Sequence, residues 1–340
     1  MASRLTSFGN DLYTGARSLD FVGKRKIWYV IASVMIIIAV IIPIVRGGFN
    51  FSIEFRGGSQ FQITNVEHTD TQDAQKAVTS VVPHTTAYVS VLGTNGIQVQ
   101  TDQLTAQQSQ EVADALARAY GVTSKDISST FIGPSWGADV TRQSIQGLVV
   151  FLLLAFFAMA LYFRTWKMSA AAIISLFHDL IITAGIYALV GFEVSPATMI
   201  GFLTILGYSL YDTVVVFDKI RENTSEELKL TRRTFAESVN LAVNQTLVRS
   251  INTAVVAVLP VASILFIGAY ILGADTLRDI SLALLIGIIV GTYSTIFIAA
   301  PLYSQFRENE KAIRKHDQKV RSVRPKAQES VVLAEQSTVP

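Results

Sequence analysis

Six long apolar runs dominate the hydrophobic pattern of the chain. They cover residues 27–45, 145–163, 168–192, 197–217, 251–273 and 280–303. Each run is long enough to cross the hydrocarbon core of a bilayer, roughly 30 Å thick, as an α-helix. The pattern therefore predicts an α-helical polytopic membrane protein with six transmembrane helices.

A different pattern fills residues 46–142, between the first two runs. Apolar residues alternate along 49–63, as in a half-buried strand, and Gly57-Gly58 indicates a bulge or bend within it. Further periodic segments predict helices at 70–82 and 105–120 and strands at 86–92, 97–101 and 127–132. This order of strands and helices predicts a ferredoxin-like α+β domain. The domain shows no catalytic cluster, so we expect a binding or mechanical module.

The composition agrees with a membrane protein. Half of the 340 residues are hydrophobic and only 16% are charged, which is unusual for a soluble domain of this length. The chain has no cysteine, which excludes disulfides and thiolate metal sites. It also lacks the phosphate-loop pattern G-x-x-x-x-G-K-[ST], so we expect no direct use of ATP. We expect no enzymatic activity, no cofactor and no nucleic-acid partner.

The basic residues are clustered, and their distribution predicts the orientation in a cell (inner or plasma) membrane. They gather beside the first run, between the second and third runs, between the fourth and fifth runs, and after the sixth: Arg17, Lys24, Arg25, Lys26, Arg164, Lys167, Lys219, Arg221, Lys229, Arg232, Arg233, Arg307, Lys311, Arg314 and Lys315. Because basic residues of short loops stay inside, both termini are predicted to be cytoplasmic.

Together these patterns divide the chain into five parts. They are a cytoplasmic N-terminal segment (1–26), transmembrane helix 1 (27–45), the extracytoplasmic ferredoxin-like domain (46–142), transmembrane helices 2–6 (143–304) and a cytoplasmic tail (305–340). The tail is charged and then polar, which predicts a helical extension that ends in disorder. The first run is long and lacks an A-x-A exit, so we expect a span there and no cleavable signal peptide.

Asp212 lies inside the fourth apolar run, where an ionised side chain costs about 2.5–3.5 kcal/mol. It must face protein or water. If the fifth helix enters the membrane near Gln245, Arg249 lies at a similar depth and can pair with it. A carboxylate balanced between pairing and burial can load and release a proton. Alternatively, Asp212 only hydrogen-bonds a neighbouring helix. Its surroundings are rich in hydroxyl groups, from Tyr208, Ser209, Tyr211 and Thr213.

Three further ionisable residues lie in or beside the apolar runs. His178 and Asp179 fall near the middle of the third run, where they either line the same polar interior or form satisfied pairs of their own. Asp218 ends the fourth run beside Lys219 and Arg221, which is more typical of a helix-end charge at the membrane surface.

Small residues and proline indicate how the apolar runs pack. Glycines at 201, 207, 287 and 291 predict close approach between helices. Pro260 predicts a kink in the fifth run.

Four motifs carry a resemblance to a known family. GYSLYDTVVVFDKIREN at 207–223 resembles the fourth-span signature of the SecF branch of the SecD/SecF protein translocase family. FSIEFRGGSQFQI at 51–63 resembles the start of its periplasmic domain. SLFHDLIIT at 175–183 resembles its third span, and NQTLVRSINT at 244–253 resembles the entry to its fifth.

The resemblance implies a resistance-nodulation-division type of fold, in which two six-span halves combine. It implies a heterodimer with SecD, association with the SecYEG channel, and YidC and YajC as further candidate partners. The chain would use the proton motive force to promote preprotein translocation after the ATP-driven step of SecA. The intramembrane carboxylate and arginine of the family fall on Asp212 and Arg249. With the charges described above, the candidate proton-coupling residues are Asp212, Arg249, Asp218, His178 and Asp179.

Other functions fit parts of the pattern. The main alternative is a proton-coupled exporter of small molecules or lipids, built on one half of the same fold. An intramembrane aspartyl protease could use Asp179 and Asp212, although Tyr211 breaks the G-x-G-D pattern of such enzymes. A purely structural scaffold would tolerate both Asp212→Asn and Arg249→Met. Proton and Na⁺ coupling are both compatible with the pattern.

Overall fold

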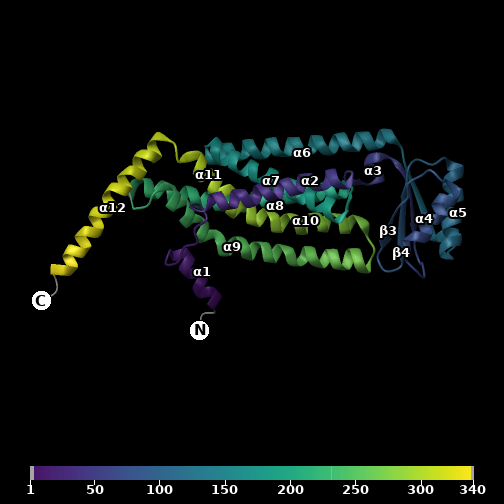
Figure 1. Cartoon of the computed structure of the whole chain (residues 1–340), viewed down its shortest axis with the longest axis horizontal. Helices are drawn as coiled ribbons and strands as arrows, with labels where there is room; N and C mark the ends of the chain where they lie inside the picture. The colour runs from purple at the N-terminus through teal and green to yellow at the C-terminus, as the bar shows by residue number, and fades with distance from the viewer. Residues whose placement is uncertain (1–3, 231, 338–340) are drawn as a thin grey trace.

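The chain folds into a long bundle of parallel and antiparallel helices with an α+β domain at one end (Figure 1). The computed structural model describes residues 4–230 and 232–337. Residues 1–3, 231 and 338–340, which belong to the predicted N-terminal segment, fourth-to-fifth loop and tail, lie outside the described residues. So does the side chain of Lys229, one of the basic residues from which the orientation is predicted.

Six helices in the described part of the chain are long and apolar enough to cross a membrane. They are α2 (Arg25–Arg46), α6 (Pro134–Phe163), α7 (Trp166–Val190), α8 (Pro196–Leu230), α9 (Phe235–Ile264) continued by the π-helix η2 (Leu265–Ile271), and α10 (Asp275–Ser294) continued by the π-helix η3 (Thr295–Ala299) and by α11 (Ala300–Arg307). Each predicted apolar run falls on one of them. The prediction of a polytopic helical membrane protein is thus confirmed.

The α+β domain is a single antiparallel sheet with two helices on one face. Its strands lie in the order β3-β4-β2-β5. The helices cover the apolar face formed by Phe61, Ile63, Ile97 and Val99. Its elements are β2 (Gly58–Ile63), α4 (Thr71–Val81), β3 (Tyr88–Leu92), β4 (Gly96–Thr101), α5 (Ala106–Tyr120), the 3₁₀ helix η1 (Ser124–Asp126) and β5 (Ile127–Ile132).

The other face of this sheet is polar and yet covered. Gln60 of β2 lies opposite Gln100 of β4, and Gln62 lies opposite Gln98. Gln98 and Gln100 are each only 4% exposed. Because buried amides require hydrogen-bond partners, this face must meet other polar groups of the chain.

The structure corrects the prediction of one strand over 49–63. Only β1 (Asn50–Phe51) and β2 are extended, and the short helix α3 (Ile53–Arg56) separates them. Phe49 and Phe55, two of the alternating apolar residues before Gly57, pack against the helical bundle and not under the sheet. At Gly57 and Gly58 the backbone turns with φ of 76° and 144°, which glycine adopts most easily.

A strand pair and a turn help to hold the α+β domain to the bundle. β1 pairs in parallel with β6 (Glu193–Val194), the short strand between α7 and α8, so that Asn50 lies opposite Glu193. The turn between β3 and β4 meets the end of η2, where a Cβ atom on Gly93 would lie 3.0 Å from Gly273 Cα. α6 begins at Pro134, so the predicted domain boundary at 142 falls within a helix.

Glycines allow α8 and α10 to pack closely. A Cβ atom at Gly287 would lie 2.2 Å from Ile205 Cγ1. At Gly201 and Gly291 the nearest side-chain atoms would lie at 2.6 Å and 2.8 Å. Gly207 has no atom within 4 Å of such a Cβ, so the prediction of close approach is wrong there: it faces away from the neighbouring helices.

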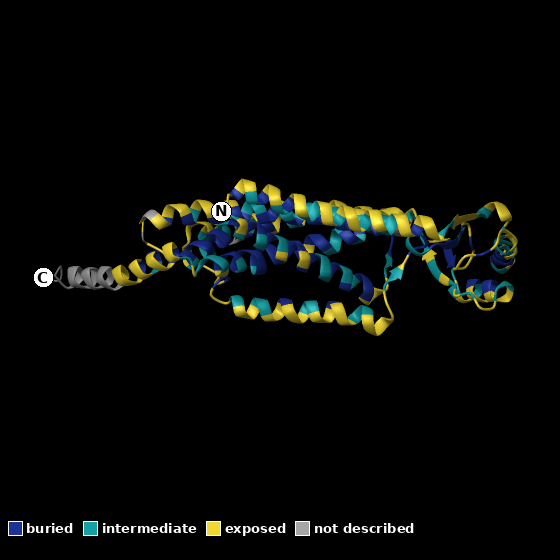
Figure 2. Cartoon of the chain, turned by 90° about the horizontal axis from the view of Figure 1, so that it is seen from above, coloured by how far each residue is buried: buried dark blue, intermediate teal, exposed yellow. Residues whose placement is uncertain are grey.

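The end of the bundle away from the α+β domain, here called the distal end, holds the largest apolar core and both terminal segments. α1 (Arg4–Thr14) packs beside α9, and α12 (Lys311–Ser337) extends outward (Figure 1). A helix thus continues to Ser337 in the tail that we predicted to end in disorder; Lys, Arg, Ala and Gln in this segment favour helix. Figure 2 shows exposed residues along the outside of the bundle and buried residues at its centre. The second half of α9 has many exposed side chains, such as Val255, Val256 and Leu259.

Candidate functional site

Asp212 lies where α8 faces α9 and is buried in the bundle, with only 6% of its surface exposed. Ser250 of α9 donates a hydrogen bond from Oγ to Asp212 Oδ1 at 2.9 Å. The second carboxyl oxygen, Oδ2, is buried and has no hydrogen-bond partner in the described part of the chain. A carboxyl group with one oxygen held and one free can accept a proton at the free oxygen.

Arg249 does not pair with Asp212, so the predicted ion pair is absent from this arrangement of helices. Its side chain is exposed, and no ion pair joins the two residues within residues 4–230 and 232–337. The reason is helical geometry. Successive residues of a helix point about 100° apart, so turning Ser250 toward Asp212 turns Arg249 away. Arg249 directly precedes Ser250, which contacts Asp212, so its positive charge stays in the neighbourhood of that carboxyl group.

His178 and Asp179 of α7 belong to a second buried network, which joins α7 to α8 and α10. His178 Nδ1 lies 3.2 Å from Asp179 Oδ1. Ser209 of α8 donates from Oγ to Asp179 Oδ2 at 2.7 Å. On the other side of the ring, His178 Nε2 shares a hydrogen bond with the hydroxyl of Tyr293 of α10. Both residues therefore line a polar interior and have partners there.

The two networks occupy neighbouring faces of α8. Thr213 Oγ1 donates to the Ser209 carbonyl oxygen at 3.0 Å and lies 2.9 Å from Thr295 Oγ1. Thr213 directly follows Asp212, so one turn of α8 carries both the free carboxyl oxygen and Ser209, whose hydroxyl contacts Asp179. This turn therefore places ionisable groups and hydroxyls together at the centre of three packed helices.

The two carboxyl groups do not form the proton-sharing pair of an aspartyl protease. Asp212 binds Ser250, Asp179 binds His178 and Ser209, and no hydrogen bond joins the carboxyls to each other in the described residues. The protease hypothesis loses its support. The same part of the chain has no group of three or more His, Cys, Asp or Glu side chains that could hold a metal ion.

Asp218 stays outside the buried site. It is exposed, and its hydrogen bond comes from the hydroxyl of Tyr162 at 3.4 Å. Of the hydroxyl residues expected around Asp212, Ser209 and Thr213 point inward, whereas Tyr211 is 57% exposed. Sequence analysis missed two residues of the site, Ser250 and Tyr293. The sequence feature that could have identified them is the presence of hydroxyl residues within otherwise apolar segments.

A second polar site lies where the α+β domain meets the bundle. This junction cavity has a volume of about 340 Å³ and is lined by the glutamine face of the sheet together with Glu193 and Asp279. Gln100 Nε2 donates to Glu193 Oε1 at 2.6 Å, and Ser195 Oγ donates to Asp279 Oδ2 at 2.6 Å. Glu193 lies between α7 and α8, outside the membrane-length helices, and burial raises its pKa to about 7.

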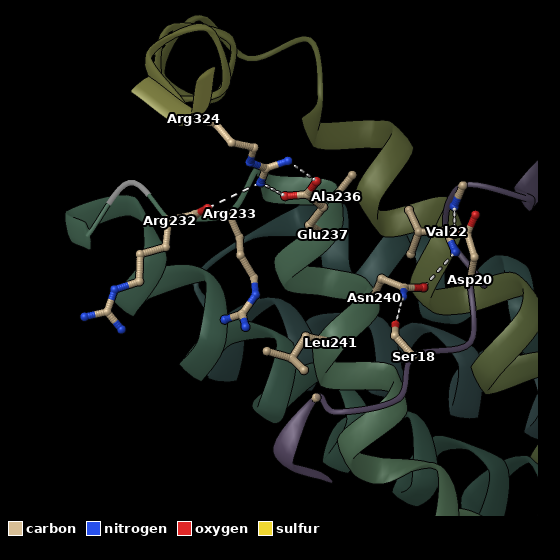
Figure 3. A pocket seen from close by; sticks show the side chains of 12 residues that line it. Ser18, Asp20, Val22, Arg232, Arg233, Ala236, Glu237, Asn240, Leu241 and Arg324 are labelled. Carbon is tan, nitrogen blue, oxygen red and sulfur yellow. Dashed lines mark hydrogen bonds and ion pairs between the residues drawn. The ribbon is translucent and has the colours of Figure 1, made fainter. Parts of the chain in front are cut away.

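A third cavity, of about 720 Å³, lies at the distal end between the N-terminal segment, α9 and α12 (Figure 3). Asn240 accepts a hydrogen bond from the Val22 N–H at 3.2 Å and donates to Ser18 Oγ at 3.1 Å. Arg324 donates to both carboxyl oxygens of Glu237, at 3.0 Å and 2.7 Å. These polar groups attach the N-terminal segment and α12 to α9, which gives the cavity a structural role.

The fold and the buried network define a class of protein: a polytopic helical membrane protein with acidic and hydroxyl groups at the centre of its bundle and an α+β domain after its first membrane helix. The family described as "Protein export membrane protein SecD/SecF, C-terminal" matches residues 111–309. The chain belongs to this family.

Relatives agree with this assignment over most of the chain. The chain is 45% identical to the protein translocase subunit SecF of Streptomyces coelicolor, over 92% of this chain and 84% of that protein. It is 41% identical to SecF of Mycobacterium tuberculosis, over 92% of this chain and 73% of that protein. The crystal structure of SecDF from Thermus thermophilus, a translocon-associated membrane protein, superposes with a TM-score of 0.73 at 29% identity, covering 86% of this chain and 39% of that one. The resemblance seen in the four motifs is confirmed.

Proposed function

We propose that the chain acts as a SecF-type subunit of the Sec protein translocase and couples proton flow to preprotein translocation. The names of its relatives support the subunit role. The Thermus SecDF chain supports SecD as a partner, because this chain matches only 39% of that fused protein. SecYEG is the proposed channel, and YidC and YajC are further proposed partners.

The observation that carries proton coupling is the state of Asp212. One of its oxygens is held by Ser250, and the other is buried without a partner in the described residues. Such a carboxyl group can take up a proton without breaking an existing hydrogen bond. Ser209, less than one turn before Asp212 on α8, donates to Asp179, which lies 3.2 Å from His178. In the proposal these residues carry the proton, and Arg249 supplies a nearby positive charge.

The proposal also assigns an orientation. We place both termini in the cytoplasm, because the basic loops lie at the distal end of the bundle. The α+β domain then lies outside the cytoplasm. The strand order β3-β4-β2-β5 supports the ferredoxin-like description of this domain. A binding or mechanical module in that position can contact a preprotein as it emerges.

The energy available is sufficient to move such a domain. One elementary charge crossing the membrane releases about 2.3 kcal/mol per 100 mV. The contacts between the α+β domain and the bundle are a two-residue strand pair, a turn and a few polar side chains. A few such contacts are worth only a few kcal/mol, so one proton step can bias the position of the domain.

The test compares Asp212→Asn with Asp218→Asn in membranes that contain the full chain, SecD and SecYEG. Asparagine keeps the shape of Asp212 but cannot take up a proton. We expect Asp212→Asn to assemble normally and to lose the stimulation of translocation by a proton gradient, while the ATP-driven step remains. Asp218→Asn is the matched control, because Asp218 lies on the same helix but is exposed. Arg249→Met should weaken the same stimulation.

Normal gradient dependence in Asp212→Asn would reject the coupling role. Copurification separates the proposal from the exporter alternative. A translocase subunit should be isolated with SecD and SecYEG, whereas an exporter should be isolated with neither.

A further inference from the structure

The junction cavity joins the α+β domain to the bundle through polar groups. Glu193 lies in β6, the strand that pairs with the chain entering the domain. Gln100 of the sheet donates from Nε2 to Glu193 Oε1 at 2.6 Å, and the same nitrogen lies 3.2 Å from Gln60 Oε1. Glu193 therefore belongs to the bundle by its backbone and to the α+β domain by its side chain.

The charges that face Glu193 do not neutralise it. Asp279 of α10 and Glu54 of α3 add negative charge, and Arg278 of α10 opposes them but contacts Asp279 at 3.4 Å. Arg56 of α3 lies over a tyrosine ring of β3, 4.3 Å from its centre. No lysine or arginine forms an ion pair with Glu193 in the described part of the chain. Partial burial without a cation favours the neutral carboxyl group.

The cavity offers partners for both protonation states of Glu193. An ionised carboxylate accepts the hydrogen bond from Gln100. A neutral carboxyl group can keep that bond and has an O–H of its own to donate. Gln98 lines the same cavity, is 4% exposed, and its Oε1 has no hydrogen-bond partner among the described residues. The cavity thus contains a buried acceptor that only an added donor can satisfy.

We propose that Glu193 is a proton-binding latch, which fastens the α+β domain to the bundle when it is protonated and loosens the domain when it is ionised. The proposal rests on the proposed orientation, in which the junction cavity lies on the side from which protons enter. It gives the α7–α8 connection a role in the proposed function, the control of domain docking, which Asp212 does not supply.

The direction of the effect follows from linkage. In the docked domain, burial raises the pKa of Glu193 from 4.5 to about 7, whereas an undocked domain leaves this side chain in water with its ordinary pKa. The docked state therefore binds the proton more tightly. Docking is favoured most below the ordinary pKa and is lost as the pH rises through about 7. Between these limits the docking equilibrium changes up to about ten-fold per pH unit.

The test measures the docked population directly, in the full chain bound to SecD in lipid vesicles. Because the natural sequence has no cysteine, Ser129→Cys in β5 and Ser263→Cys in α9 place two spin labels at these positions and at no other residue of this chain. Both positions are exposed. Double electron–electron resonance then gives the distance distribution as the pH changes. We expect the population at the docked distance to grow as the pH falls from above about 7 toward 4.5.

Glu193→Gln imitates the neutral acid, so it should stay docked at alkaline pH and lose the pH response. Glu111→Gln, an exposed carboxylate on α5, is the matched control and should titrate as the wild type does. Gln100→Leu removes a donor that favours the ionised form and lowers the pKa of Glu193, so the pH response of this variant should shift to higher pH. This second variant keeps the test valid if Glu193→Gln fails to fold.

The latch is rejected if the wild type shows no change in distance over this range, or if Glu193→Gln retains the response. Neither result depends on translocation, so the failure of the latch differs from the failure of the proposed function. If Asp212→Asn keeps its gradient dependence while Glu193 titrates as expected, the coupling role of Asp212 fails and the latch stands.

Discussion

Replacement of Gly287 by alanine should destabilise the bundle through one defined contact. The new Cβ would lie 2.2 Å from Ile205 Cγ1 and 2.9 Å from both methyl carbons of that side chain, Cγ2 and Cδ1. Ile205 is only 2% exposed, so it cannot swing into open space. Either Ile205 must change rotamer within a packed core or α8 and α10 must separate. Overpacking of this kind costs about 1–3 kcal/mol.

Helix propensity works in the opposite direction and must be removed from the comparison. Glycine to alanine within a helix stabilises by about 1 kcal/mol. Gly207 supplies the matched control, because it lies on α8 and a Cβ there would meet nothing within 4 Å. Gly207→Ala gains the propensity without the clash. The difference in unfolding free energy between Gly287→Ala and Gly207→Ala therefore isolates the clash, and we expect about 1–3 kcal/mol.

The free energy of unfolding can be measured by titrating the purified chain, bound to SecD, with a denaturing detergent. Ile205→Ala removes all three clashing carbons and by itself costs about 2–5 kcal/mol. In that background the clash is absent, so Gly287→Ala should be no less stable than Gly207→Ala. If the two glycine variants have equal stability in the natural background, or if Ile205→Ala leaves their difference unchanged, the contact between α8 and α10 does not have the assigned geometry.

Two other contacts give simpler tests. Tyr293→Phe removes the hydroxyl bonded to His178 Nε2, so we expect weaker gradient stimulation of translocation and a loss of about 1–3 kcal/mol in unfolding free energy, with SecD binding intact as measured by copurification. Normal stimulation would place His178 outside the proton path. Arg324→Met breaks the ion pair with Glu237. The side chains of Arg324 and Glu237 are 46% and 43% exposed, so the loss in unfolding free energy should stay below about 1 kcal/mol and disappear at high salt. A larger, salt-independent loss would contradict this solvent-screened description.

The membrane helices could be predicted because lipid allows few alternatives. A backbone in hydrocarbon must satisfy its own hydrogen bonds, so a long apolar run has to be a helix. The segment 49–55 lies outside this constraint, and its alternating pattern favoured a strand. In the structure Phe49 and Phe55 pack against the bundle on either side of β1 and the start of α3. A period of two residues does not reveal which partner a side chain meets.

The acidic residues of the candidate site could be predicted from the sequence, but the side chains that they contact could not. Asp179 and Asp212 stand out because a carboxylate in an apolar run is costly. Whether Asp212 meets Arg249 or Ser250 depends on the rotation of α9 about its own axis, which the packing of the whole bundle determines. Glu193 was not identified, because a glutamate in a short loop is usually solvated. Docking of the α+β domain gives it a buried environment.

The two polar sites are connected by α7 and α8. Glu193 lies between these helices, and the same helices carry Asp179 and Ser209, whose side chains are joined at 2.7 Å. From Asp179 to the end of α7 the helix rises about 17 Å without interruption. A rigid helix transmits a tilt at one end to the other, and a hydrogen bond this short has little tolerance for displacement. Docking at the junction cavity and the Ser209–Asp179 contact should therefore change together, unless α7 or α8 bends between them.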